Sequence, residues 1–158
     1  LLKEHNGRWF LFGHAEGKDP NLGYNLALDR IVGEPTVLRE IDEYISAPKG
    51  FYGDFFKNIV GVSHCKDEMP TTIVVRATNH KVFKLVETKK IHHSQQVIRP
   101  YALHDDGEYG EFELFVETNN EFIGRVLQMG GGLVIVSPAK IRNIFKQRIL
   151  NMSELYKD

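Results

Sequence analysis

The chain has only one cysteine, Cys65, among its 158 residues. A single thiol cannot form an internal disulfide, which excludes the small, disulfide-stabilised class of secreted proteins. The chain also lacks any apolar run near the roughly 18–20 residues of a membrane span, so we expect no contact with a membrane. It begins Leu1-Leu2-Lys3-Glu4, without the basic and then apolar plan of a signal peptide. These absences favour a cytoplasmic protein, and the strand-like apolar start favours a chain whose upstream part has been removed.

An excess of charge of either sign is lacking too. The chain has 20 lysines and arginines against 21 aspartates and glutamates, for a net charge of −1. Bulk charge therefore identifies no partner. With 42% apolar and 26% charged residues, the composition is that of an ordinary globular protein. A chain of this length can bury roughly 68–70% of its unfolded surface, so we expect one or two small domains with a real core.

Catalytic and metal-binding motifs are also absent. His64-Cys65 and His92-His93 supply four potential ligands, but adjacent residues of a strand or helix point in different directions. No C-x-x-C or H-x-x-x-H spacing accompanies them. Neither Cys65 nor Ser94 has the nucleophile-elbow glycines or the third orienting group that catalysis by a nucleophile needs. We therefore predict a non-enzymatic protein with no metal and no cofactor.

Residues 1–45 carry the pattern of a small antiparallel β-structure. Asn6-Gly7 is the dipeptide typical of a two-residue type I′ hairpin, because both central residues need positive φ. One strand is expected on each side of this turn, and two further strands are expected at residues 24–31 and 36–41. Successive antiparallel strands with tight turns predict a small barrel that lacks at least one strand.

Residues 46–70 are expected to form a linker with one short helical turn. This segment is rich in glycine and contains four aromatic residues, Phe51, Tyr52, Phe55 and Phe56. Such a cluster is suited to stacking nucleobases, but packing of the aromatic rings onto the barrel is the favoured interpretation.

Residues 71–158 show a regular alternation of strands and helices. The periodicity predicts strands at 72–77, 97–101, 111–118 and 133–136, and helices at 79–88 and from Asn119 or Asn120 to Gly130. This β-α-β-β-α-β order is that of a ferredoxin-like unit, so the fold class is α+β. Ser137 as a cap and Pro138 at the first helical position predict a terminal helix. Its apolar stripe must pack on its own sheet or on a partner subunit.

A group of polar and aromatic residues in the barrel half is the candidate ligand-binding site. Its members are Arg8, Trp9, His14, Tyr24 and Arg30. Cationic groups beside exposed aromatic rings allow a small β-barrel to hold phosphates and stack bases. The competing structural interpretation places Trp9 in the core and Arg8 in solvent beside the hairpin turn.

Two short blocks in this half resemble the signature of the WYL domain of bacterial transcriptional regulators. They are the residues Gly7-Arg8-Trp9-Phe10-Leu11-Phe12-Gly13 and Leu28-Asp29-Arg30-Ile31, and the family's Trp-Tyr-Leu triplet is here Trp9-Phe10-Leu11. The resemblance implies an Sm/SH3-like barrel over residues 1–45, truncated at its N-terminus. The ferredoxin-like unit over residues 71–158 is similar to the WCX extension that follows the WYL domain in these regulators.

The resemblance also implies a function. The WYL barrel is expected to bind a nucleotide or a short single-stranded nucleic acid as an effector. Trp9 and Arg30 match motif positions of the family, and the other three candidates lie beside them. An arginine that many members carry shortly before the second block is missing from residues 22–27, which removes one expected phosphate contact.

Partners follow from the same resemblance. The extension is expected to contribute to a homodimer, and DNA is expected to be bound only through an N-terminal helix-turn-helix that this chain lacks. A rival hypothesis is a protein-interaction or dimerisation module whose barrel binds no ligand.

Overall fold

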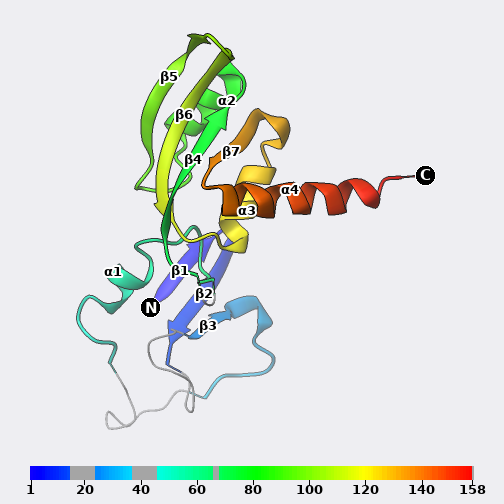
Figure 1. The fold of residues 1–158 in the computed structure, drawn as a ribbon. Coiled ribbons are helices and arrows are strands. Elements are labelled where there is room, and N and C mark those ends of the chain that lie inside the picture. Colours follow the sequence, from blue (N-terminus) through cyan, green and yellow to red (C-terminus); the bar gives the residue numbers. More distant parts are fainter. Residues whose placement is uncertain (15–23, 37–45, 66–67, 158) are drawn as a thin grey trace. The chain divides into compact units, whose positions relative to one another are not determined.

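The computed structural model describes residues 1–14, 24–36, 46–65 and 68–157. The chain divides into two compact units, Leu1–Lys57 and Asn58–Asp158. Each unit holds one antiparallel sheet, with three strands in the first and four in the second (Figure 1). The predicted α+β fold class is confirmed. The expected division into barrel, linker and extension stays a prediction.

The first unit is built around a hairpin. Strands β1 (Leu2–His5) and β2 (Arg8–Gly13) pair antiparallel, and β3 (Tyr24–Ala27) joins the other edge of β2. Asn6 and Gly7 have φ values of 53° and 76°, the left-handed conformation that the turn requires. The hairpin predicted from this dipeptide is therefore confirmed.

The strand predicted over residues 24–31 is only half correct. β3 ends at Ala27, and Leu28–Arg30 form the 3₁₀ turn η2, closed by a hydrogen bond from the Ile31 N–H to the Leu28 carbonyl at 3.2 Å. Asp29 lies in this turn and forms an ion pair with Arg8 at 3.0 Å, a tertiary contact that the local alternation did not reveal.

The rest of the predicted barrel is only partly described. The described residues of the first unit form an open three-stranded sheet rather than a closed barrel. Most of the strand predicted at residues 36–41 lies outside the described residues. The short helical turn expected after it is present as α1 (Phe51–Phe55).

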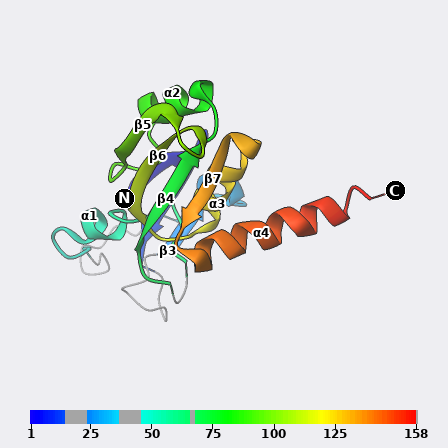
Figure 2. The same cartoon turned by 45° about the horizontal axis from the view of Figure 1, so that its top comes forward.

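The second unit has the predicted element order. It consists of β4 (Thr71–Ala77), α2 (His80–Thr88), β5 (Gln96–His104), β6 (Gly107–Val116), α3 (Asn120–Leu127), η4 (Gly130–Gly132), β7 (Leu133–Ser137) and α4 (Ala139–Glu154). The sheet order is β5-β6-β4-β7, the arrangement expected of a ferredoxin-like unit. Helices α2 and α3 lie on one face of this sheet (Figures 1 and 2).

Two helix ends differ from the prediction. Ser137 is the last residue of β7, and Pro138 is the N-cap of α4 rather than its first helical residue. α3 ends at Leu127, before Gly130, which lies in η4 with a φ of 56°. Of the two N-cap candidates, Asn119 and Asn120, the structure selects Asn119, whose side chain accepts a hydrogen bond from the Phe122 N–H at 2.8 Å.

The core of the second unit lies between the sheet and the two helices. Alternate strand residues such as Val75 and Phe112 are fully buried and pack with Phe83 of α2 and Phe122 of α3. The first turns of α4 join this core through Ile141 and Phe145. Beyond them, α4 runs away from the sheet on the side of β7 (Figure 2).

Candidate functional site

The strand register decides which predicted site residues lie together in the first unit. Residues directly opposite in an antiparallel pair share a face of the sheet. Gly13 lies opposite Tyr24, and Trp9 has the same parity along β2 as Gly13. Trp9 and Tyr24 therefore lie on one face, whereas Arg8 lies on the other.

The face that carries Trp9 and Tyr24 is exposed. Their exposed fractions are 53% and 49%, and Leu2 and Leu11 on the same face are also exposed. The interpretation of Trp9 as a core residue is therefore wrong. Because Gly13, which lies opposite Tyr24, is four residues along β2 from Trp9, each ring is a separate position on which a planar ligand can stack.

The predicted cationic residues are placed differently. The Arg8 guanidinium is already paired with Asp29, so an anionic ligand would compete with a carboxylate for it. Arg30 is the last residue of η2 and is exposed, and His14 is exposed just after β2. The structure brings Trp9 and Tyr24 to a common face but does not gather the five predicted residues around one point.

The aromatic cluster near α1 has a structural role. The buried ring of Phe12 contacts the rings of Phe55 and Phe56 at centroid distances of 5.8 and 4.9 Å. The Tyr52 hydroxyl donates a hydrogen bond to the Phe12 carbonyl at 3.1 Å. The Lys3 ammonium lies 3.8 Å from the centre of the Phe56 ring, and burial lowers the pKa of this lysine. The favoured packing interpretation is confirmed.

The face of the second sheet that points away from α2 and α3 carries a network of charged residues. This network was not identified from the sequence. Buried Glu111 accepts from Arg76 at 2.8 Å, and the Arg76 guanidinium lies 3.7 Å from the centre of the Tyr109 ring. Arg99 donates to the Tyr109 hydroxyl at 2.6 Å. The sequence feature that could have indicated this network is the alternation of Tyr109 and Glu111 with buried residues along β6. The network joins β4, β5 and β6 and satisfies a buried carboxylate.

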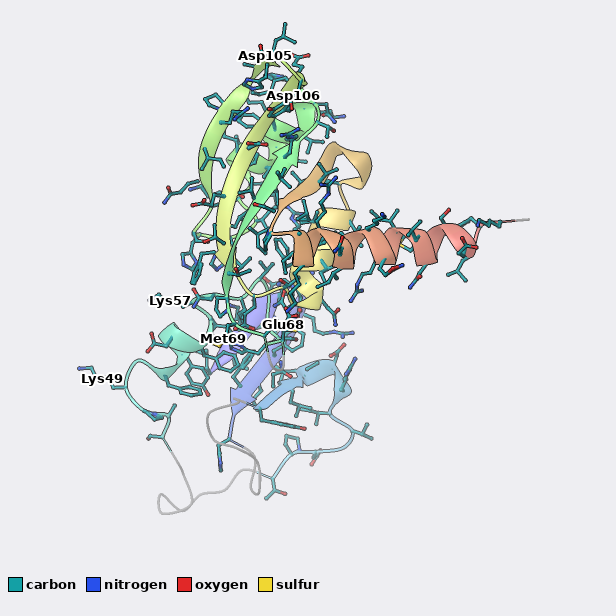
Figure 3. The ribbon with its side chains drawn as sticks, viewed as in Figure 1. Lys49, Lys57, Glu68, Met69, Asp105 and Asp106 are labelled. Atoms are coloured by element: carbon teal, nitrogen blue, oxygen red, sulfur yellow. The ribbon has the colours of Figure 1, made fainter. Side chains whose placement is uncertain are left out.

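This network extends to the tip of the β5-β6 hairpin. Asp106 lies at that tip (Figure 3), where a hydrogen bond with Tyr109 lowers the pKa of its carboxyl. Burial, followed by the hydrogen bond with Asp106, raises the pKa of the Tyr109 hydroxyl. Both shifts favour the protonated tyrosine beside an ionised aspartate.

The histidine-containing pairs considered as metal or catalytic candidates have hydrogen-bonding partners. His64 Nδ1 lies 2.8 Å from the buried carboxylate of Glu117, which also accepts from the Cys65 backbone N–H at 3.0 Å. His92 Nδ1 lies 2.8 Å from the Ser94 hydroxyl. Within the described ranges, no group of three His, Cys, Asp or Glu side chains is arranged to hold a metal ion. The expected lack of metal and of catalysis stays a prediction.

Comparison with known proteins identifies the second unit. No curated protein is found to match the chain. None of the described helices has the length and apolar character needed to cross a membrane. The family model of the WCX domain matches residues 69–153. This match includes β4 to β7 and nearly all of α4, more than half of the chain. The WCX domain is the C-terminal extension of WYL-containing regulators, and this chain belongs to the WCX domain family.

Proposed function

We propose that this chain is the effector-sensing fragment of a bacterial transcriptional regulator of the WYL type. The effector is a nucleotide or a short single-stranded nucleic acid, which stacks on the face of the first sheet that carries Trp9 and Tyr24. The observation that carries the proposal is the half-exposed position of both rings on one face. The WCX match supports it, since this extension accompanies the WYL domain in regulators. The proposal assigns the chain no catalytic role.

The geometry orders the contributions to effector binding. Stacking of a base on an aromatic side chain contributes about 1–3 kcal/mol for each base and tolerates any base. Arg30 is exposed and is the better candidate for a phosphate contact, because Arg8 is paired with Asp29. Binding should therefore depend more on Trp9 than on Arg8.

Substitution of Trp9 by alanine tests this proposal. We expect the Kd for a short oligothymidylate to rise roughly 5- to 150-fold, the range that corresponds to the loss of one stacking contact. Isothermal titration calorimetry at low and moderate salt measures the effect, and affinity should fall as salt rises if Arg30 meets a phosphate. Circular dichroism checks that the variant is folded, as expected for the loss of an exposed side chain.

Phe115→Ala is the matched control, because it removes a half-exposed aromatic ring from the second unit. This control should leave the Kd unchanged. If neither mononucleotides nor oligonucleotides bind at low salt, or if Trp9→Ala binds as tightly as the wild type, the interaction-module hypothesis gains and the sensing proposal fails.

A homodimer is the second function that a specific observation favours. Leu155 and Tyr156, which directly follow α4, are 83% and 86% exposed. Exposed apolar side chains are a feature that a partner can cover. We propose that a second copy of the chain does so in solution.

Leu155→Glu should weaken this dimer. Burial of a leucine side chain contributes about 1.5–3 kcal/mol, so we expect the dimer dissociation constant to rise roughly 10-fold or more. Sedimentation equilibrium of wild type and variant measures the change. A chain that is monomeric at high concentration, or a variant that dimerises like the wild type, contradicts the proposal.

A further inference from the structure

A groove of about 690 Å³ lies between β7 and α4 in the second unit. Its walls are mostly apolar and include Leu133 and Ile135 of β7 and Phe145, Ile149 and Met152 of α4. Ile149 and Met152 are exposed, although they line a concave surface. The volume falls within the range of roughly 300–1,000 Å³ that is typical of small-molecule sites.

Two cations of α4 line the same groove. Arg142 and Lys146 are four positions apart in α4, so their side chains are neighbours on one face of the helix. Within the part of the chain that the structure describes, neither forms an ion pair. Lys140 and Arg148 of the same helix differ, because Lys140 pairs with Glu68 at 3.2 Å and Arg148 donates to Asn120 at 2.9 Å.

The combination of an apolar groove with the side chains of Arg142 and Lys146 specifies the chemistry of an occupant. An apolar body gains by leaving water against the exposed side chains of Val134, Ile149 and Leu150. A carboxylate at one end gains charge-assisted hydrogen bonds from Arg142 and Lys146. A nucleobase fits this groove less well, since its one aromatic ring, Phe145, is buried in the core and not presented for stacking.

We propose that the groove between β7 and α4 binds a small amphipathic carboxylate with an unbranched acyl chain. The carboxylate lies between Arg142 and Lys146, and the acyl chain lies along the apolar wall. This site is separate from the stacking face of the first unit. The WCX domain would then respond to a ligand of a different class from the nucleotide effector.

Calorimetry with decanoate, below its micelle concentration, tests the proposal on the full chain. We expect one decanoate for each chain and a Kd that rises with salt, because the head-group contact is electrostatic. Shortening the acyl chain should weaken binding about fourfold for each methylene that is removed. The double substitution Arg142→Gln and Lys146→Gln should raise the Kd roughly 10-fold or more. Decylamine, with a similar tail and a cationic head, should bind far more weakly.

Two glutamate variants of the C-terminal segment distinguish the groove from the rest of the surface. Ile149→Glu places a carboxylate inside the groove and should abolish decanoate binding. Leu155→Glu introduces the same charge outside the groove lining and should leave the Kd unchanged, whether or not it weakens the dimer. Circular dichroism and thermal unfolding check that both variants are folded, as expected because both side chains are exposed.

Several outcomes would overturn the proposal. Equal binding of decylamine and decanoate would show an apolar surface without charge selection. Equal loss of binding in both glutamate variants would place the ligand elsewhere. Binding to phosphatidylglycerol vesicles without binding of free decanoate would show a membrane-surface helix, and a dimer that binds no decanoate would show that a second copy fills the groove. Trp9→Ala should leave decanoate binding unchanged, so this proposal and the nucleotide proposal fail independently.

Discussion

Phe112→Ala should lower the free energy of unfolding of the second unit by about 3–5 kcal/mol, the usual cost of deleting a buried aromatic side chain. Phe112 is 0% exposed and lies at the centre of the core. Its ring stacks on that of Phe83 with a centroid distance of 4.8 Å, so alanine leaves a cavity under α2. The loss is a large fraction of the total stability of a small domain.

Urea unfolding monitored by two probes measures this effect. Far-UV circular dichroism follows both units, whereas the fluorescence of Trp9, the only tryptophan, reports on the first unit. Phe115→Ala is the matched control, since Phe115 lies on the same strand but has the opposite parity and is 46% exposed. We expect it to cost less than about 1 kcal/mol. Equal losses in the two variants would show that the assigned core face of β6 is wrong.

Local sequence signals predicted the elements whose structure depends on neighbouring residues. The Asn6-Gly7 dipeptide predicted the first hairpin, because few residue pairs adopt positive φ at both positions. The alternation along residues 111–118 predicted the second part of β6, which starts at Gly107 and ends at Val116, and its buried face, since one side of this strand packs on helices and the other does not. The pair Asn119-Asn120 predicted the start of α3 to within one residue, because a short asparagine side chain can replace a missing acceptor at a helix end.

The errors arose where a contact between distant residues decides the structure. The alternation of Leu26 and Leu28 predicted one strand to residue 31, but the chain turns at Leu28, and Asp29 in that turn pairs with Arg8. Ser137 was predicted as a helix cap from its position before a proline, yet it completes the ladder of β7 against Val74. Pairing between strands took precedence over the local capping signal at this position.

The candidate site was only partly predicted, because it too depends on contacts between residues that are distant in sequence. Arg8 and Trp9 are adjacent in sequence, but adjacent residues of a strand point to opposite faces, so they do not act on one ligand from the same side. Trp9 and Tyr24 share a face because of the register between β2 and β3. The sequence between these two strands does not indicate which residues will lie opposite each other. The groove of the second unit was missed altogether, because it forms only where β7 and α4 meet in space.

Asn119 connects two parts of the second unit. The side-chain oxygen caps α3 through the Phe122 N–H, and the side-chain amide donates to the carbonyls of Val60 at 2.8 Å and Ser63 at 2.7 Å. The residue is 2% exposed, so water cannot replace these bonds in place. It holds the segment before β4 against the start of α3.

Asn119→Ala should therefore lower the free energy of unfolding by about 2–5 kcal/mol. The cap accounts for about 0.5–2 kcal/mol of this loss, and the remainder comes from two buried carbonyls left without a donor. Asn119→Ser restores a capping oxygen but not the amide donors, so it should recover only the share of the cap, about 0.5–2 kcal/mol. Urea unfolding followed by circular dichroism measures both variants.

Asn79→Ala is the matched comparison, because the Asn79 side chain caps α2 through the Val82 N–H at 2.9 Å and is exposed. It should cost about 1 kcal/mol, as an ordinary cap does. Hydrogen exchange should show a second difference: the Glu117 N–H, which donates to the Asn58 carbonyl at 2.8 Å, should lose protection in Asn119→Ala and keep it in Asn79→Ala. If the two alanine variants lose equal stability and keep equal protection at Glu117, Asn119 acts only as a helix cap, and the segment from Asn58 to Ser63 is held by other contacts.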